Sequence, residues 1–308
     1  MPVLNRLIQP FRRHNRDADS SHSATQAGFE AACSRLLSTC SNPQCSSGWL
    51  KTWRGRTAPI FEGGWCCSPA CTAALVAWAL RREIEMMGDA EQTHRHRIPL
   101  GLVMMERGWI SAAQLRDALE AQRAAGAGRI GHWLIHRQGV SEHLVTRALG
   151  LQWRCPVLGL DGHEPESVAA LVPRLFVDAF GALPLRSAAG RLLYIGFEER
   201  LDPVLALAVE RMTDLRVESG LVRDSLFRPA HARMLQAKFP GVELIEAVSE
   251  QVLANELTRR VERARPVDCR LVRVHDCFWM RLWKRPQRRP LPEVDAVEDL
   301  ICSLQVQL

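Results

Sequence analysis

The chain of 308 residues contains very few lysines and no phosphate-binding loop of the P-loop type. Its lysines are Lys51, Lys238 and Lys284, and none lies in the G-x-x-x-x-G-K-[ST] pattern with which P-loop proteins hold ATP. No paired carboxylates and no Ser/His/Asp arrangement stand out either. We therefore expect no ATP hydrolysis, and we expect the protein not to be an enzyme.

The chain also lacks an apolar run of transmembrane length, and its first residues lack the apolar core that a signal peptide needs. These absences predict a cytoplasmic protein, in which cysteines stay reduced. The formal net charge of +6 suits anionic partners. The excess of positive charge is too small to indicate nucleic-acid binding, so we expect no DNA partner.

Cysteine, by contrast, is concentrated: six of the ten cysteines lie between positions 33 and 71. The segment C-S-N-P-Q-C puts two of them on a tight turn, and W-C-C-S-P-A-C puts three just before an apolar helix. Two such pairs can supply the four thiolates of a tetrahedral structural zinc site. The predicted ligands are Cys40, Cys45, Cys67 and Cys71.

Other interpretations of these cysteines stay open. Cys66 can replace Cys67 as a ligand, and Cys33 fits helix packing. All of these thiols can instead be buried and free, and disulfides are the least favoured reading in a reducing compartment. A site closed by four cysteines has no open coordination position, so we expect its zinc to be structural.

The centre of the chain contains one 24-residue pattern twice, at 99–122 and 129–152. Each copy has a Leu/Ile-Gly opening, a short apolar run, a glycine, a serine and a closing glutamine. The first copy predicts a short helix over 102–107, a left-handed Gly108, and a second helix capped by Ser111, with Gln114 completing a capping box. The second copy predicts Ser141 as its cap. The sequence thus predicts two helix–turn–helix units that share a core.

This repeat resembles the MshEN domain, the cyclic di-GMP-binding N-terminal domain of type II secretion and type IV pilus assembly ATPases. That family's motif is R-L-G-x-x-L-V-x-x-G-x-I-x-x-x-x-L-x-x-x-L-x-x-Q, used twice. The resemblance implies a c-di-GMP site formed by Arg97, Leu100, Gly101, Gln122, Arg129, Ile130, Gly131 and Gln152. Two positions depart from the motif: Pro99 stands at the first arginine, and Gln138 stands at the second copy's central glycine.

The residue types of the motif suit such a ligand. A glycine at a helix start lets backbone N–H groups approach a phosphate, and an arginine can pair with phosphate or stack on guanine. A glutamine amide can both donate to and accept from a base edge. The alternative is that Gly101 and Gly131 only allow tight packing and that the glutamines only cap helix ends.

The resemblance implies a regulatory or adaptor protein that responds to c-di-GMP and contacts a protein of secretion, pilus or signalling machinery. The alternative function is a protein–protein interaction scaffold with structural zinc, whose repeat no longer binds nucleotide.

The sequence as a whole predicts a mainly α protein with a small α+β part. The tandem helix–turn–helix repeat is preceded by a small zinc-binding module and followed by an α+β subdomain. The expected divisions are a flexible tail (1–28), the cysteine-rich module and helix (29–90), the repeat (91–165), the α+β subdomain (166–240), and a C-terminal helix with a basic aromatic tail (241–308). In the last part a Val/Leu stripe predicts a helix from Glu243. His275, Asp276 and Cys277 invite a catalytic interpretation, because Cys and His can supply nucleophile chemistry. We disfavour it because adjacent residues rarely point the same way.

Overall fold

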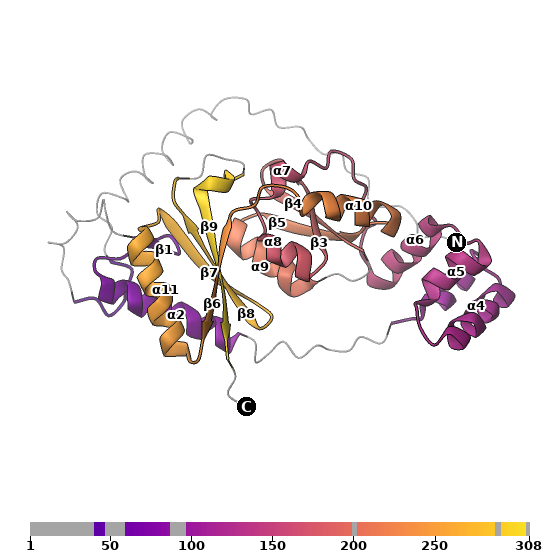
Figure 1. Cartoon of the computed structure of the whole chain (residues 1–308), viewed down its shortest axis with the longest axis horizontal. Coiled ribbons are helices and arrows are strands. Elements are labelled where there is room, and N and C mark those ends of the chain that lie inside the picture. Colours follow the sequence, from indigo (N-terminus) through magenta and orange to yellow (C-terminus); the bar gives the residue numbers. More distant parts are fainter. Residues whose placement is uncertain (1–39, 47–58, 87–96, 199–201, 287–290, 306–308) are drawn as a thin grey trace, which may run out of the picture.

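The computed structural model describes residues 40–46, 59–86, 97–198, 202–286 and 291–305. It is a mixed structure of helix and sheet, with helical hairpins at one end, a small sheet in the middle and a larger sheet at the other end (Figure 1). The predicted tail over 1–28 and Cys33 lie outside the described residues. None of the described helices combines the length and apolar character needed to cross a membrane.

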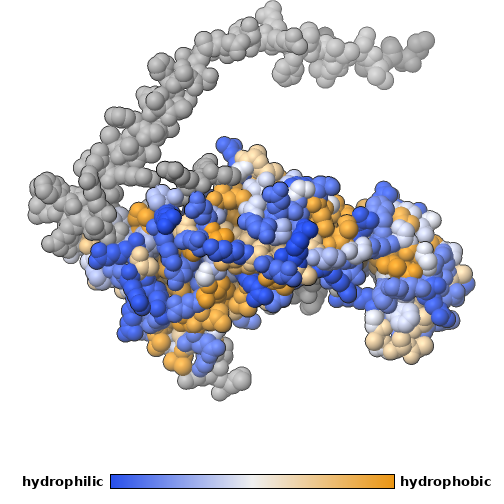
Figure 2. All heavy atoms as spheres, turned by 45° about the horizontal axis from the view of Figure 1, so that its top comes forward, coloured by the Kyte–Doolittle hydropathy of each residue, from blue (hydrophilic) through white to orange (hydrophobic). Residues whose placement is uncertain are grey.

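The helical end contains two helix–turn–helix units that share one core. Its helices are α3 (Leu100–Glu106), α4 (Ala112–Ala125), α5 (Ile130–Gln138) and α6 (Glu142–Trp153). The capping box of α4 forms as predicted, because Ser111 Oγ accepts from Gln114 N while Gln114 Oε1 accepts from Ser111 N. In the space-filling view these helices form a separate lobe (Figure 2).

The second unit differs from the first in how its first helix ends. Gly108 follows α3 with φ 68°, as the sequence predicts. The displaced glycine of the second copy, Gly139, ends α5 with φ 65°, and α5 therefore includes Gln138. Ser141 is the N-cap of α6 but makes no capping bond with its side chain. The departure from the motif at Gln138 is thus absorbed by a longer helix.

The middle part is a three-stranded sheet with helices packed on it. Its elements are α7 (Pro165–Val168), α8 (Arg174–Ala179), β3 (Ala182–Ala188), β4 (Leu192–Phe197), α9 (Pro203–Thr213), β5 (Arg216–Leu221) and α10 (Asp224–Met234). The order is β3-β4-β5, with β3 antiparallel and β5 parallel to β4. Asp202 caps α9 by accepting from Leu205 N, with Pro203 at the first helical position.

The C-terminal part is a four-stranded sheet with one helix. Its elements are β6 (Gly241–Ala247), α11 (Glu250–Ala264), β7 (Asp268–Val274), β8 (Cys277–Trp283), a 3₁₀ turn (Val294–Ala296) and β9 (Val297–Leu304), with strand order β6-β9-β8-β7. The predicted helix is present, but it is shorter than the sequence indicates, because residues 241–247 form β6. The helix begins only after Ser249, and the basic aromatic segment is a β-hairpin whose Trp279 and Trp283 are buried.

The cysteine-rich module packs against this C-terminal sheet. Its elements are β1 (Ile60–Phe61), β2 (Gly64–Trp65) and α2 (Pro69–Glu85). Helix α2 lies beside α11, and Val76 and Leu80 share a core with Leu257 and Met280 (Figure 1). The sequence treated 29–90 and 241–308 as separate parts. The structure joins their described residues, because α2 and α11 are both amphipathic and cover one face of the same sheet.

Two ion pairs lie where the middle part meets the C-terminal sheet and α2. Arg281 and Asp299, each 0% exposed, pair through two bonds of 2.7 and 2.8 Å, and Arg281 also donates to Leu171 O. Glu83 of α2 receives both guanidinium nitrogens of Arg211 from α9. The other face of the sheet packs on the middle part through Trp279 and its neighbours.

Candidate functional site

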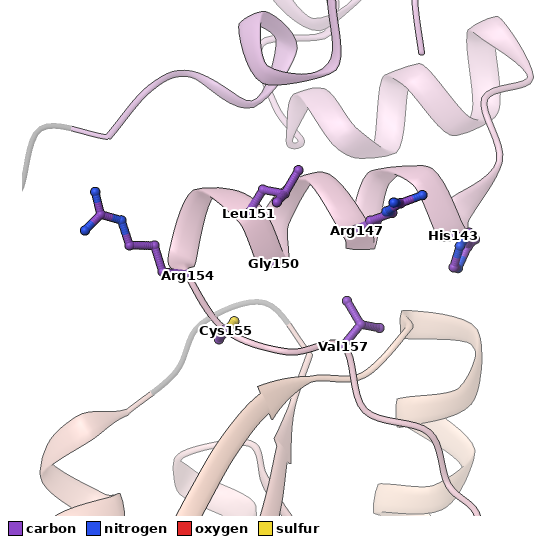
Figure 3. A pocket seen from close by; sticks show the side chains of 7 residues that line it. All are labelled: His143, Arg147, Gly150, Leu151, Arg154, Cys155 and Val157. Atoms are coloured by element: carbon purple, nitrogen blue, oxygen red, sulfur yellow. The ribbon is translucent and has the colours of Figure 1, made fainter. Parts of the chain in front are cut away.

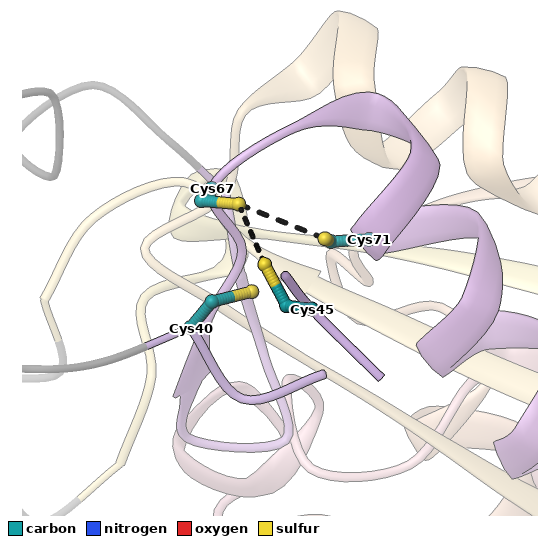
Figure 4. A group of neighbouring side chains, drawn as sticks. All are labelled: Cys40, Cys45, Cys67 and Cys71. Atoms are coloured by element: carbon teal, nitrogen blue, oxygen red, sulfur yellow. Dashed lines mark hydrogen bonds between the residues drawn. The ribbon is translucent and has the colours of Figure 1, made fainter. Parts of the chain in front are cut away.

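Four cysteine sulfurs meet at one edge of the cysteine-rich module. The Sγ atoms of Cys40, Cys45, Cys67 and Cys71 all lie within 4.8 Å of one another. The first two come from a turn, the third follows β2 and the fourth lies in the first turn of α2 (Figure 4). The structure thus brings together the four residues that the sequence spacing selected.

Local hydrogen bonds hold both halves of this cluster. Asn42 shapes the first turn, since its carbonyl accepts from Cys45 N at 3.0 Å and its side chain accepts from Gln44 N. Ser41 N donates to Trp65 O at 2.9 Å, which ties this turn to β2. Ser68 caps α2 and accepts from Cys71 N.

The spacing of the thiols fits a tetrahedral metal ion. Sulfur atoms about 2.3 Å from a central zinc lie about 3.8 Å apart. Here the Sγ atoms of Cys45 and Cys67 are 3.4 Å apart, and those of Cys67 and Cys71 are 3.6 Å apart. The four thiols can therefore hold a metal ion with little rearrangement.

The two ends of the cluster differ in acidity. Burial raises the pKa of Cys40 to about 12. Burial also acts to raise the pKa of Cys71, but hydrogen bonds from Ser68 and Asn42 outweigh it and lower that pKa overall. A thiolate is the form that binds metal, so the lowered pKa favours the ligating form of Cys71 and the raised pKa disfavours that of Cys40.

Cys66 and Cys67 are separated by their environments. Cys66 is 0% exposed in the core that α2 shares with the sheet, and burial raises its pKa to about 11. Cys67 points to the cluster (Figure 4). The sequence left either residue as the ligand, and the structure selects Cys67.

The two glycines of the repeat lie against apolar side chains of the following helices. A Cβ atom at Gly101 would lie 2.5 Å from Leu115 Cδ1, and one at Gly131 would lie 2.9 Å from Val145 Cγ1. Leu100 is also close to Gly131, at 3.5 Å from the same Cβ position. The starts of α3 and α5 therefore lie side by side, and both glycines are needed for the helices to approach.

The closing glutamines tie each unit to the start of the other. Gln122 Nε2 donates to Gly128 O at 2.7 Å, just before α5, and Gln152 Nε2 donates to Ile98 O at 2.7 Å, just before α3. The two bonds are equivalent, so the repeat closes on itself. These bonds match the alternative in which the glutamines only cap helix ends.

The two arginines of the predicted site occupy different positions. Arg129 is the N-cap residue of α5. Pro99 holds the corresponding place before α3. Arg97 lies with its guanidinium carbon 3.2 Å from the ring centre of Trp153, at the end of α6. Ile130 begins α5 and packs against the core of the repeat, in which Leu100 is buried.

A second feature of α6 escaped the sequence interpretation. A cavity of about 610 Å³ lies beside this helix, lined by His143, Arg147, Gly150, Leu151, Arg154, Cys155 and Val157 (Figure 3). The sequence signal was present, because His143 and Arg147 are one turn apart on α6 and Arg154 follows two turns later. This spacing was overlooked because the same helix also carries the residues of the repeat motif.

The disfavoured Cys277 and His275 pair has other neighbours. His275 Nε2 lies 2.7 Å from Asp202 Oδ2, and its ring packs on Phe180. Burial raises the pKa of Cys277. These contacts are consistent with a structural role for both side chains.

No protein-family model and no curated protein matches the chain. Among solved structures, a structure of MshE with c-di-GMP is 26% identical with a TM-score of 0.37, over 45% of this chain and 99% of that one. A structure of the N-terminal domain of XpsE is 20% identical with a TM-score of 0.31, over 44% of this chain and 92% of that one.

Proposed function

We propose that this chain is a non-catalytic binding protein whose tandem repeat holds cyclic di-GMP and passes the signal to a protein partner. The observation that carries the proposal is the equivalence of the two helix starts. Each has a glycine in its first turn and is tied to the other unit by a closing glutamine, Gln122 or Gln152. Cyclic di-GMP itself has two identical halves, each with one phosphate and one guanine, and so suits two equivalent sites side by side.

The chemistry at these starts supports an anionic, aromatic ligand. The first N–H groups of α5 have no partners within the helix, and the positive end of the helix favours a phosphate. Arg129 at the N-cap can reach a phosphate or stack on a base. Arg97 already stacks on an aromatic ring, that of Trp153, which is the geometry that a guanine would adopt against it. The partner, by the resemblance, belongs to secretion, pilus or signalling machinery.

A second candidate, a scaffold without nucleotide binding, also has an observation in its favour. Gly101 and Gly131 have packing partners inside the lobe, and the glutamine amides already bond to backbone carbonyls. On this interpretation the glycines and glutamines of the motif serve the packing and closure of the lobe. The two candidates differ in whether the arginines contact a ligand.

In both candidates the four cysteines hold a structural zinc ion. Four thiolates complete a tetrahedron and leave no position for substrate, so the ion would stabilise the fold and take no part in catalysis. The ion would link the turn at Cys40 to the start of α2, and through α2 to the C-terminal sheet.

Calorimetric titration of the whole chain with c-di-GMP tests the proposal. We expect saturable binding at one molecule or one stacked pair per repeat. If c-di-GMP near 1 mM produces no heat of binding and leaves the melting temperature unchanged, the scaffold function would remain.

A further inference from the structure

The cavity beside α6 lies at the joint between the helical lobe and the middle sheet. Val157, on its far wall, forms a parallel bridge with Leu221 at the end of β5, and Leu158 N donates to Leu221 O at 2.7 Å. Val157 points back toward the helix (Figure 3). A volume of about 610 Å³ falls within the range of small-molecule sites, roughly 300–1,000 Å³.

The charges that line this cavity are all of one sign. His143 and Arg147 contribute side chains from α6 and Arg154 contributes one from the residue that ends it. None of the described residues that line the cavity is a carboxylate. The nearest acid along the helix, Glu142, already accepts two hydrogen bonds from Ser225 at the start of α10. Its carboxylate is therefore held toward α10, and the two arginines make the cavity favourable for an anion.

The positions of the cations suit an elongated ligand. Arg147 lies with its guanidinium carbon 5.2 Å from the ring centre of Trp109, which restrains its side chain. Arg154 follows seven residues later, a distance of about 10 Å along a helix axis. His143 lies one turn before Arg147, so two cationic or donor groups gather at one end and a planar guanidinium lies at the other.

Between them the cavity is apolar. Leu151 is 43% exposed and Val157 is 38% exposed, which is high for large apolar side chains. Gly150 lets the helix approach the following segment, because a Cβ atom there would lie 3.0 Å from Cys155 O. Leu151 and Val157 therefore give the cavity exposed apolar surface that a flat ring can contact.

We propose that this cavity is a second ligand site, which binds a mononucleotide with its phosphates at Arg147 and His143 and its base over Leu151 and Val157. Arg154 stacks on or bonds to the far edge of the base. The site shares no residue with the predicted c-di-GMP site, so it does not depend on that function. Because it lies at the joint, its occupant contacts both the lobe and the segment that pairs with the end of β5.

The probes are GTP and ATP, with tripolyphosphate as the same charge without a ring. Calorimetry on the whole chain measures their dissociation constants for the parent, for Arg147→Ala combined with Arg154→Ala, and for Arg116→Ala. Arg116 is exposed on α4 and does not line the cavity, so it is the matched control. Circular dichroism and melting establish that each variant is folded. Hydrogen–deuterium exchange gives a second readout over residues 143–158.

We expect at least one nucleotide to bind at least tenfold more tightly than tripolyphosphate. The double variant should lose at least tenfold in affinity, the control less than twofold, and exchange should slow over 143–158. The proposal is overturned if neither nucleotide binds, if tripolyphosphate binds as tightly, or if the folded double variant binds like the parent. It is equally overturned if Arg129→Ala removes nucleotide binding, because the ligand would then occupy the repeat.

Discussion

The side chain of Gln152 donates a hydrogen bond to the carbonyl oxygen of Ile98 across 54 positions of sequence, with an N···O distance of 2.7 Å. The end of the repeat is thereby joined to its beginning. Gln122 makes the equivalent bond to Gly128 over six positions. The same sequence pattern thus produces a short-range contact in the first copy and a long-range contact in the second. The long-range contact joins the two ends of the lobe.

Replacing Gln152 should therefore weaken the lobe. Gln152→Ala removes the donor to Ile98 O, and the free energy of unfolding should fall by about 1 kcal/mol, the usual value of a single hydrogen bond. Urea denaturation measures it. Gln236→Ala is the control, because Gln236 is exposed on the surface, and it should change the free energy by less than about 0.5 kcal/mol. Equal effects of the two changes would contradict a closing role for Gln152.

Glu83→Gln should lower the free energy of unfolding by more than Gln152→Ala does. Burial acts to raise the pKa of Glu83, but Arg211 and Arg82 outweigh it and lower that pKa overall. Removing the charge leaves the guanidinium groups of Arg211 and Arg82, which are 30% and 26% exposed, without this anionic partner. Because these groups keep contact with water, the cost should stay below the roughly 3–5 kcal/mol of fully buried pairs. Urea denaturation at pH 7 compares it with Glu85→Gln, an exposed change on the same helix that should have little effect.

The same carboxylate predicts a dependence on pH. A lowered pKa in the folded state means that the stabilisation is present above the unfolded-state pKa and is lost as the pH falls through the folded-state pKa. The difference in unfolding free energy between the parent and Glu83→Gln should therefore be largest near neutral pH and should shrink in acid. A difference that stays constant from pH 7 to pH 3 would show that the charge of Glu83 is not its cause.

Metal content tests the cysteine cluster. Protein purified under reducing conditions and without chelator should contain about one zinc per chain, as a four-cysteine site requires. Cys67→Ser combined with Cys71→Ser should lose the metal and lower the melting temperature. Cys155→Ser is the control, because Cys155 lies outside the cluster and should leave the zinc content unchanged. Metal-free parent protein with the same melting temperature would exclude a structural ion.

Affinity for c-di-GMP tests the repeat directly. An arginine–phosphate contact is a charge-assisted hydrogen bond of roughly 1.5–3 kcal/mol, so Arg129→Ala should weaken binding about tenfold or more. Arg97→Ala should cost less, because Arg97 stands outside the motif's register and stacks on Trp153. Arg137→Ala, an exposed change on the same helix as Arg129, should leave affinity within twofold. If the Arg129→Ala protein binds c-di-GMP as tightly as the parent, the repeat does not use the arginine contact that the resemblance implies.

Where interactions are local, the sequence was sufficient. Ser111 and Gln114 predicted a capping box, because this pattern acts within one turn of helix. The spacing of the cysteines likewise selected the four thiols that meet. The repeat pattern predicted the pairs of helices, including the left-handed Gly108.

Only the tertiary structure decided the rest, because it depends on segments that are distant in sequence. Cys66 and Cys67 are chemically identical, and the core under α2 determines that Cys66 is buried while Cys67 faces the cluster. The basic aromatic hairpin of β7 and β8 is stable because α2, from the other end of the chain, covers one face of its sheet. The cavity beside α6 exists because Val157 pairs with Leu221, more than sixty positions later, and no periodicity within α6 can specify that contact.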